Sequence, residues 1–590
     1  MKSLHNSKAL IWPLLLIFTL TWLYVLGIRT LVPPDEGRYA EMAREMLASG
    51  DWITTRLNGI KYFEKPPLQT WMNALSFAAF GLGEWQARLW TGVCGWFGVV
   101  LTAYAGCKVL NQRAGFYAGL VLASSFFWVA SSQIDSLDMS LSCMMTISLC
   151  ALLMAQRDGA SQAEQRNWML LCWAGMALAV LAKGLIGFVL PGAVLMLYMF
   201  AARDWRIWSR LHLLKGLLLF FVIAAPWFVL VALKNPEQPH FFFIHEHVER
   251  FLLKTHHREG AWYYFFAMLI PGIVPWLGLL LQSLTSVVNP VVNPVVNPAL
   301  KRAVTAVQPN AGRAAFKPKL LCLIWAVFIF FFFSYSSSKL PGYILPIFPA
   351  LALLTGAYLE TCSRRTAIAN AALLGLMGVS GLALVPQMPK AAHLAAEVGL
   401  MLAYQPWALG AGVVAVVGAA LALKFALAFE RLKQKYDARD CFVLCLAVTG
   451  FISTELLLSG FEAYGKHRAG LALVPAMKAE LLPDTKIYSV RIFEQSLPFY
   501  LRRKMILVDY LDEFSFGLEQ QPELALATID AFVAQWTQDA GAGVRDIAIT
   551  GLDTYQDLLK RHVPMRIVVQ DSRRIVVANL LANSLQKNTP

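Results

Sequence analysis

Residues 9–28 read ALIWPLLLIFTLTWLYVLGI and contain no charged side chain. A helix of about 20 apolar residues is long enough to cross the hydrocarbon core of a bilayer. Because a backbone in hydrocarbon must satisfy its own hydrogen bonds, we expect this run to be helical. Lys2 and Lys8 precede the run and no small-residue cleavage site follows it. We therefore expect a retained first helix that also targets the chain.

Similar apolar runs recur through the first 460 residues. The chain of 590 residues is 57% hydrophobic and 15% charged, whereas soluble domains are about half apolar and about a quarter charged. The sequence thus predicts a polytopic α-helical membrane protein. We expect about thirteen transmembrane helices, at roughly residues 9–28, 88–107, 114–132, 137–155, 168–182, 184–201, 213–233, 262–284, 320–335, 341–358, 366–386, 407–429 and 441–460.

The basic residues indicate the topology. If the N-terminus is cytoplasmic, the short loops rich in Lys and Arg fall on the inner side, for example Lys108 with Arg113 and the group at 203–210. This asymmetry is the positive-inside rule. It also explains the net charge of +14 without a nucleic-acid partner, because the basic residues lie in short loops between apolar runs. An odd number of spans places the C-terminal tail outside, in the periplasm of a Gram-negative cell.

The composition changes near residue 461. We expect a transmembrane domain over residues 1–460, with a long first periplasmic loop at 29–87, and a small periplasmic α/β domain over 461–590. Its expected strands are 486–490, 505–508, 546–549, 566–569 and 574–578, and its expected helices are 522–538 and 552–561. No nucleotide-binding glycine motif occurs in it. Within the transmembrane domain, three tandem Val-Val-Asn-Pro repeats at 287–298 predict a linker without regular helix.

The first outside loop is dense in charged and aromatic residues. Asp35 follows Pro33 and Pro34, whose fixed φ angles favour a rigid turn that holds a carboxylate at the membrane boundary. The same position suits a helix N-cap, and the two roles are compatible. Residues 38–48 and 66–81 have the pattern of amphipathic helices that lie on a membrane surface. Glu64 and Lys65 form either an ordinary surface turn or a headgroup-level pair in which Lys65 binds a phosphate.

Further polar residues open spans on the outside. Asp135 suits a helix cap, whereas Asp138 lies deeper and is favoured as functional, since boundary carboxylates are costly. The histidine-rich loop at 240–258 is either solvated surface or a possible metal site without a recognised ligand spacing. Lys339 and Tyr343 could both reach a phosphate, although snorkelling and interfacial anchoring explain this segment better when it is taken by itself.

The polar residues of the outside loops are more informative together than singly. The topology places carboxylates and cations from distant parts of the chain at one membrane face, and this combination suits an anionic, lipid-linked substrate. A lipid or sugar-lipid transporter would more often carry its charges near the bilayer midplane. The group comprises Asp35, Glu64, Lys65, Asp138, His245, Arg250, Lys339 and Tyr343.

Three motifs carry a family resemblance. Residues 34–41 (PDEGRYAE), 62–67 (YFEKPP) and 339–343 (KLPGY) resemble bacterial C-type membrane glycosyltransferases, which are relatives of the protein O-mannosyltransferases. Within that superfamily the sequence is most similar to the lipid A 4-amino-4-deoxy-L-arabinose transferases. The resemblance covers the membrane part and extends to the outside tail. Gly37 and the pair at 66–67 also occur in bacterial members with other sugars, so the resemblance specifies the reaction more closely than the sugar.

The resemblance implies a reaction and a set of roles. The implied donor is an undecaprenyl-phosphate-linked sugar, the implied acceptor is a lipid A phosphate, and transfer inverts the sugar carbon at the periplasmic face of the inner membrane. Asp35 and Asp138 match acidic positions near the reacting sugar. Lys65, Arg250 and Tyr343 match positions that hold the carrier phosphate. Glu64 and His245 match a metal-binding pair, with zinc as the implied ion and no nucleotide cofactor. The open alternatives are another polyprenyl-phosphate-linked sugar passed to a glycan, lipid or protein, and a transporter.

Overall fold

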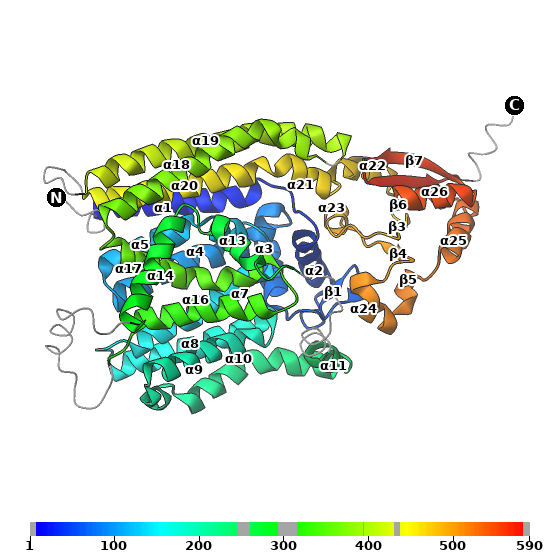
Figure 1. Ribbon diagram of the computed structural model, residues 1–590. Helices are drawn as coiled ribbons and strands as arrows, with labels where there is room; N and C mark the ends of the chain where they lie inside the picture. Colours follow the sequence, from blue (N-terminus) through cyan, green and yellow to red (C-terminus); the bar gives the residue numbers. More distant parts are fainter. Residues whose placement is uncertain (1–7, 245–259, 293–314, 393, 430–436, 582–590) are drawn as a thin grey trace. The chain divides into compact units, whose positions relative to one another are not determined.

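The computed structural model describes residues 8–244, 260–292, 315–392, 394–429 and 437–581 (Figure 1). The residues group into two compact units. The helical unit comprises Met1–Leu26, Arg88–Ala391 and Tyr404–Gly460, and the α/β unit comprises Gly27–Ala87, Ala392–Ala403 and Phe461–Pro590. The loop that the sequence placed in the transmembrane domain, 29–87, therefore groups with the C-terminal part of the chain instead.

A helix lies in every apolar run that was predicted to span the membrane. Eight apolar stretches of the described chain are long enough to cross a bilayer, or ten if two bent pairs each count as one span. A multi-pass membrane protein is confirmed, while the number thirteen stays a prediction. The helices are α1 Lys8–Tyr24, α4 Glu84–Val109, α5 Gln112–Ser124, α6 Phe126–Ser132, α7 Leu137–Gln156, α8 Gln162–Lys183, α9 Ile186–Ala202, α10 Leu213–Lys234, α11 Gln238–His240, α13 Tyr264–Gly272, α14 Leu277–Val292, α16 Pro318–Tyr335, α17 Phe348–Leu359, α18 Arg364–Leu384, α19 Ala395–Leu427 and α20 Ala438–Gly460.

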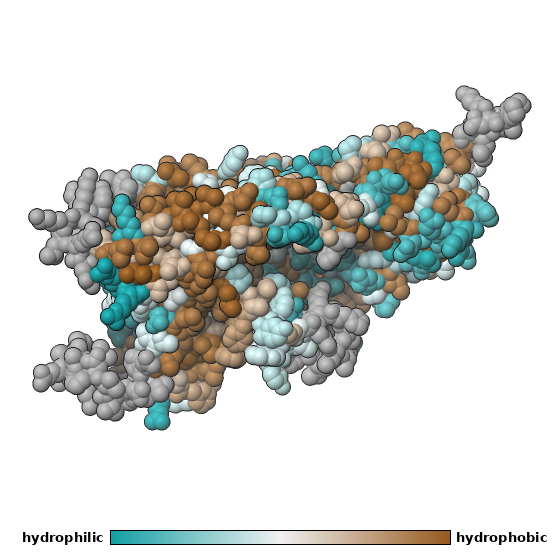
Figure 2. All heavy atoms as spheres, turned by 45° about the horizontal axis from the view of Figure 1, so that its top comes forward, coloured by the Kyte–Doolittle hydropathy of each residue, from teal (hydrophilic) through white to brown (hydrophobic). Residues whose placement is uncertain are grey.

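The helical unit exposes apolar side chains on its surface, which hydrophobic colouring shows in Figure 2. Along α10, Leu214, Leu218 and Phe221 are 85%, 66% and 58% exposed. A helix that is apolar all round is stable only inside a protein or in a membrane. Since α10 is not buried by protein, its surroundings are lipid. By contrast, 89% of the apolar stretch of α7 is buried, so α7 lies in the core of this unit.

Two predicted spans are bent. The run 114–132 breaks by 63° between α5 and α6, and the run 262–284 breaks by 112° between α13 and α14. At the first break, the hydroxyls of Ser124 and Ser125 donate to carbonyls one turn back, at 2.7 Å each, a pattern that often bends helices. At the second, Pro271 and Pro275 lack the N–H that a continuous helix needs.

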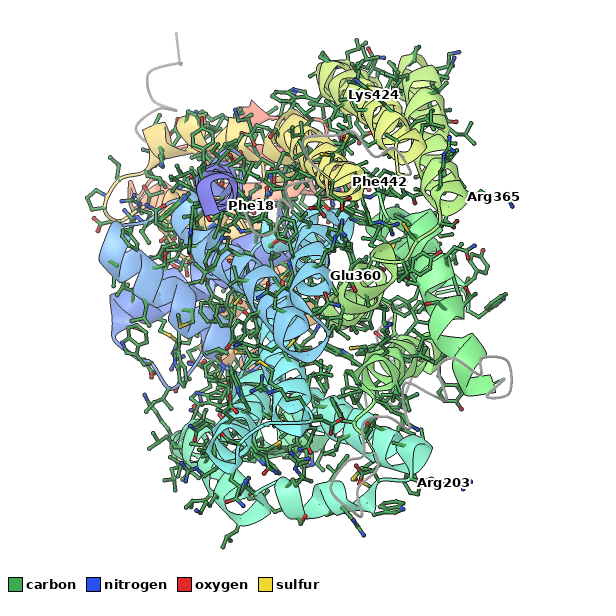
Figure 3. The ribbon with its side chains drawn as sticks, turned by 90° about the vertical axis from the view of Figure 1, so that its left-hand side faces the viewer. Phe18, Arg203, Glu360, Arg365, Lys424 and Phe442 are labelled. Atoms are coloured by element: carbon green, nitrogen blue, oxygen red, sulfur yellow. The ribbon has the colours of Figure 1, made fainter. Side chains whose placement is uncertain are left out.

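Figure 3 labels four charged residues of the helical unit, which lie near the ends of helices. Arg203 follows α9, Glu360 follows α17, Arg365 lies in the first turn of α18 and Lys424 lies in the last turn of α19. Arg203 and Arg365 lie in predicted short basic loops of the kind that the positive-inside rule assigns to the inner side, and that side stays a prediction.

Part of the Val-Val-Asn-Pro repeat is helical, against expectation. Helix α14 extends through Val292 and so includes the beginning of the repeat. The remainder of the repeat lies outside the described residues.

The first loop folds as part of the α/β unit. Helices α2 Asp35–Ser49 and α3 Leu68–Phe80 pack together through a shared core with Phe499. The apolar face of α2 is therefore covered by protein. The expectation that it lies on a membrane surface is wrong. Between the helices, β1 Arg56–Leu57 and β2 Ile60–Lys61 pair antiparallel. Their turn is Asn58-Gly59, both at positive φ, which is a strong hairpin signal in a sequence.

The C-terminal part forms a mixed sheet with helices on both faces (Figure 1). The strand order is β5-β4-β3-β6-β8-β7, in which β3 to β6 are parallel and β8 and β7 antiparallel. The strands are β3 Ile487–Val490, β4 Ile506–Val508, β5 Ala525–Leu526, β6 Ile547–Gly551, β7 Met565–Gln570 and β8 Arg574–Asn579. The helices are α21 Glu462–Arg468, α22 Val474–Glu480, α23 Leu497–Leu501, α24 Ser515–Gln520, α25 Ile529–Gly541 and α26 Leu552–Lys560.

All five predicted strands match, but the predicted helix at 522–538 is partly wrong. Its first residues form a 3₁₀ turn, Pro522–Leu524, followed by β5, and α25 begins only at Ile529. The start is set by Thr528, whose hydroxyl accepts a hydrogen bond from the backbone N–H of Ala531 at 3.2 Å. Alternate residues of β3, β6 and β8 face two separate hydrophobic clusters, so both faces of the sheet are buried, as in most parallel sheets.

Arg574 is a buried charge that ties α21 to the sheet. It is 1% exposed and forms ion pairs with Glu494 at 3.1 Å and Asp571 at 2.7 Å. It also donates hydrogen bonds to the backbone carbonyls of His467 and Arg468, at the end of α21. Arg574 therefore links the end of α21 to β8.

Arg574→Ala is expected to lower the free energy of unfolding of the α/β unit by about 3–5 kcal/mol, because removing one member of a buried ion pair strands the other. Proteolysis of the full chain in graded urea measures this. Arg561→Ala is the matched control, since its partner Asp530 has an 87% exposed side chain, and we expect a loss below about 1 kcal/mol. Equal losses in the two variants would contradict the role of Arg574.

The carboxyl of Asp546 makes the stability of the α/β unit depend on pH. Burial, together with the neighbouring Asp539, raises the pKa of Asp546 to about 7. Lys486 and Tyr488 also face this pair, and the Lys486 ammonium donates to Asp539 at 2.7 Å. A raised pKa means that the folded unit holds the proton more tightly than the unfolded chain does. The contribution to stability is thus complete below about pH 4 and is lost as the pH rises through about 7.

Asp546→Asn is expected to remove this pH dependence and to stabilise the unit by about 2 kcal/mol at about pH 8, where the wild-type carboxyl is charged. The amide oxygen can still accept the 3.0 Å hydrogen bond from the backbone N–H of Lys486. Thermal unfolding of the wild type and of Asp546→Asn, measured from acidic to alkaline pH, tests this prediction. A variant with the same pH slope as wild type would refute the assignment.

Candidate functional site

Asp35 lies in the first turn of α2 in the α/β unit. The residue before it, Pro34, is the N-cap, so Asp35 is not the cap that the sequence offered as one role. Its carboxylate accepts a 3.3 Å hydrogen bond from Arg38, and its side chain is 49% exposed. Glu36 instead folds back and accepts a 2.9 Å hydrogen bond from the backbone N–H of Val32. Asp35 is thus left as an accessible carboxylate at a positively polarised helix start.

The Arg38 guanidinium contacts both Asp35 and Glu513, a residue far away in the sequence. The guanidinium forms a 2.6 Å ion pair with Glu513, which also accepts hydrogen bonds from Gln495 at 2.9 Å and Tyr62 at 3.4 Å. Burial raises the pKa of the Glu513 carboxyl, and the Arg38 charge opposes that rise. We call Asp35, Arg38, Tyr62 and Glu513 the α2 cluster.

Gly37 lets α2 approach the chain closely. A Cβ atom at this position would lie 2.5 Å from Oγ and 2.6 Å from Cα of Ser496. The Ser496 hydroxyl donates to the carbonyl of Leu31 at 3.1 Å, just before the two prolines. A larger residue at 37 would therefore push apart the segments that hold Asp35 in place.

Glu64 and Lys65 are both half-buried in the α/β unit. The Lys65 ammonium donates to the carbonyl of Glu64 at 2.7 Å. The proposed metal partner of Glu64, His245, lies outside the described residues, as does Arg250. Among the residues that the structure does describe, no group of three or more His, Cys, Asp or Glu side chains could hold a metal ion. The described donors alone do not form a metal site, and the zinc site stays a prediction.

Asp138 belongs to a second cluster, in the helical unit. It lies in the first turn of α7 and forms an ion pair with Lys183, the last residue of α8. The Lys183 ammonium also lies 4.7 Å from the ring centroid of Tyr343, a cation–π contact. The backbone of Gly342 is packed against the Asp138 carboxylate. We call Asp138, Lys183, Gly342 and Tyr343 the α7 cluster.

Two neighbours of the α7 cluster differ from expectation. Asp135 does not cap α7, because Ser136 is the N-cap and Asp135 is fully buried before it. Lys339 is 7% exposed, and its ammonium donates to the carbonyls of Ser334 at 2.8 Å and Ser336 at 2.9 Å. Burial lowers the pKa of Lys339.

Five residues of the two clusters were not among the predicted site residues. One of them, Gly342, was quoted only as part of the motif at 339–343. A signal for Lys183 was present, since it is a lone cation between two apolar runs, and such charges are costly in a membrane. Arg38 and Tyr62 lie within the quoted motifs without a distinguishing feature. Glu513 had no local signal, because its partner Arg38 is far away in the sequence.

Comparisons with known proteins identify the family of the chain. Residues 10–242 match the model of dolichyl-phosphate-mannose-protein mannosyltransferases, and residues 473–579 match the aminoarabinose transferase C-terminal domain. The structure resembles the crystal structure of ArnT from Cupriavidus metallidurans bound to undecaprenyl phosphate, with a TM-score of 0.86 and 36% sequence identity. That match covers 98% of this chain and 99% of the other.

Curated relatives carry related names. Undecaprenyl phosphate-alpha-4-amino-4-deoxy-L-arabinose arabinosyl transferase of Edwardsiella ictaluri is 28% identical over 379 residues, 63% of this chain and 64% of that protein. The arabinosyl transferase 1 of Proteus mirabilis is 28% identical over 470 residues, 76% of this chain and 71% of that protein. The chain thus spans just under two thirds of the first relative. Together with the 36% identity over almost the whole of the crystallised protein, these matches establish that the chain belongs to the ArnT family of C-type membrane glycosyltransferases.

Proposed function

We propose that this chain transfers 4-amino-4-deoxy-L-arabinose from undecaprenyl phosphate to a phosphate of lipid A, at the periplasmic face of a bacterial inner membrane. The observation that carries the proposal is the likeness, over 98% of the chain, to an ArnT crystallised with undecaprenyl phosphate. The lipid-facing helical unit supports a substrate that remains in the bilayer.

The proposed reaction exchanges one phosphate for another at the sugar. An oxygen of the acceptor phosphate forms a bond to the anomeric carbon with inversion. The bond from that carbon to the carrier phosphate breaks, and its electron pair leaves on undecaprenyl phosphate. Because the acceptor phosphate is already ionised near neutral pH, the reaction needs no strong general base.

The main task of the protein is to stabilise the leaving phosphate. Cationic and hydroxyl donors held ready in a site of low dielectric constant do this most effectively. We assign this role to Lys65, Arg250 and Tyr343. The contact between Tyr343 and the Lys183 ammonium supports it, because the cation adds positive potential beside the Tyr343 ring.

The two carboxylates have the complementary role. As positive charge develops at the anomeric carbon, a fixed carboxylate nearby lowers the energy of the transition state. Asp138 is suited to this because Lys183 fixes one of its oxygens. Asp35 is suited because it remains half-exposed while Arg38 orients it. Either carboxylate can also bind the sugar amine.

Mass analysis of lipid A tests the proposal. Cells that express this protein, with the aminoarabinose donor available, are expected to contain lipid A carrying one added pentosamine, and cells that lack it are not. An added hexose or hexosamine would replace the sugar in the proposal. Lipid A that is unchanged while another glycan, lipid or protein gains the sugar would replace the acceptor.

A further inference from the structure

The segment Ser336–Tyr343 joins α16 to the first turn of the 3₁₀ helix η5 Pro341–Ile347 and passes beside Asp138. We call this segment the strap. A hydrogen bond from the N–H of Tyr343 to the carbonyl of Leu340, at 3.1 Å, closes a tight turn at its end. At Gly342 the strap therefore presents backbone to Asp138, while the Tyr343 ring contacts Lys183.

Lys339 fixes the beginning of the strap. Its ammonium donates to two carbonyls, Ser334 in the last turn of α16 and Ser336 just after it. The carbonyls at a helix end have no partner within the helix, and a lysine there also complements the helix dipole. The ammonium lies 5.5 Å from the ring centroid of Phe265 as well. Lys339 is thus engaged in holding backbone.

Gly342 sets the distance between the strap and Asp138. A Cβ atom at 342 would lie 2.5 Å from Cγ and 2.8 Å from Cβ of Asp138, closer than real atoms approach. The φ angle of Gly342 is not in the left-handed region, so a residue with a side chain can adopt this backbone. The requirement for glycine is therefore one of space, and the group that occupies the space is the Asp138 carboxylate.

The Asp138 side chain is consequently confined from two directions. Lys183 holds one carboxylate oxygen through their ion pair, and Gly342 closes the space on the side of the strap. The two confining elements come from distant parts of the chain, α8 and the strap. Tyr343, next to Gly342, packs against Phe333 in a tilted arrangement with ring centroids 5.1 Å apart, which keeps this part of the strap in place.

We propose that Lys339 and Gly342 are positioning residues, in which Lys339 anchors the strap and Gly342 holds the Asp138 carboxylate against Lys183. This inference rests on the proposed function for the role of Asp138 in sugar transfer. It also gives Lys339 a different task from the phosphate binding that its sequence position suggested. A positioning residue of this kind changes the rate of the chemical step more than it changes donor binding.

Carbodiimide coupling tests the geometry without any substrate. The reagent joins a carboxylate to an amine with which it is already paired, so the wild-type protein is expected to yield a peptide in which Asp138 is linked to Lys183. Gly342→Ala is expected to lower that yield at least about fivefold, because an added methyl group displaces the carboxylate. Gly192→Ala is the matched control, since a Cβ atom there meets nothing within 4 Å, and its yield should equal that of wild type.

Kinetics of the same variants test the role. For Gly342→Ala we expect kcat to fall about 10²-fold with KM for the donor changed less than about threefold, as misplacement of a reacting group predicts. The double variant Gly342→Ala/Lys183→Met should be no slower than the slower single variant, because both act through Asp138. A coupling yield and a rate that both match wild type would overturn the proposal. So would loss of either one without the other.

Lys339→Met separates anchoring from phosphate binding. Anchoring predicts a lower coupling yield and unchanged affinity for undecaprenyl phosphate, measured directly with the purified protein. Weaker binding of undecaprenyl phosphate with a wild-type coupling yield would assign Lys339 to the phosphate and overturn the anchoring role. If wild-type protein couples Asp138 to Lys183 but transfers no sugar, the proposed function fails while the geometry stands.

Discussion

Replacing Asp35 with asparagine is expected to lower the rate of sugar transfer by about 10³-fold, equivalent to roughly 4 kcal/mol of transition-state stabilisation. Asparagine has the size of aspartate and can keep the 3.3 Å hydrogen bond from Arg38. The loss therefore reports the charge itself, which the proposed mechanism uses to stabilise the developing positive charge on the sugar. Initial rates with purified protein in proteoliposomes provide the measurement.

Two controls accompany the prediction for Asp35→Asn. Asp484→Asn changes an exposed carboxylate of the same unit, and substitutions at such positions alter stability by less than about 0.5 kcal/mol, so its rate should match that of wild type. Binding of undecaprenyl phosphate should be unaffected by Asp35→Asn. If the rate of Asp35→Asn stayed within about tenfold of wild type, Asp35 would have no central part in the reaction.

Replacing Lys183 with methionine is expected to lower kcat by about 10²-fold, because it removes the cation that orients a largely buried carboxylate. The side chains of Lys183 and Asp138 are 13% and 19% exposed, so water cannot easily take the place of either partner. Methionine keeps most of the length and apolar volume of lysine. The loss is therefore one of charge, and it should appear in kcat more than in KM for the donor.

Lys424→Met is the matched control for this change. Lys424 is exposed in the last turn of α19, and Figure 3 labels it. The same substitution at this position should leave kcat within about twofold of wild type. Lys183→Met with an unchanged kcat would show that the ion pair with Asp138 has no part in the reaction.

The fold of the membrane part could be predicted from the sequence because hydrocarbon imposes a single rule on it. Every run of apolar residues must be a helix, and each predicted run contains one. The bends could not be predicted in the same way. At Ser125 the break depends on side-chain hydrogen bonds to the backbone, and serine also occurs in straight helices. At Pro271 and Pro275 the signal was present but gives no angle.

In the α/β unit, single elements could be predicted from the sequence, but the set of segments that form the unit could not. Five of its strands, β3, β4, β6, β7 and β8, followed from local patterns. Its membership did not, because residues 27–87 join it through contacts distant in sequence. Thr30 donates to Glu462 at 2.7 Å and Leu31 donates to the hydroxyl of Tyr500 at 2.9 Å. Asn58 exchanges two hydrogen bonds with the backbone of Met505, at 2.6 and 2.7 Å. No local pattern reveals such pairings.

Some residues of the candidate site could be predicted from the sequence, whereas the residues that orient them could not. Asp35 was predicted from the two prolines before it, Asp138 from the cost of a carboxylate at the membrane boundary, and Tyr343 from the motif at 339–343. The partners that orient them, Arg38 with Glu513 and Lys183, required the fold. The need for glycine at 342 also required it, since only the structure shows that Asp138 fills the space beside it.

The most direct test of the central claim is a transfer assay with purified components. Wild-type protein in proteoliposomes, given undecaprenyl-phosphate-linked aminoarabinose and lipid A, should add one pentosamine to lipid A and release one undecaprenyl phosphate for each addition, as mass spectrometry of both lipids would reveal. Donor that crosses the bilayer intact, with lipid A unchanged in mass, would contradict the account and identify the protein as a carrier rather than a transferase.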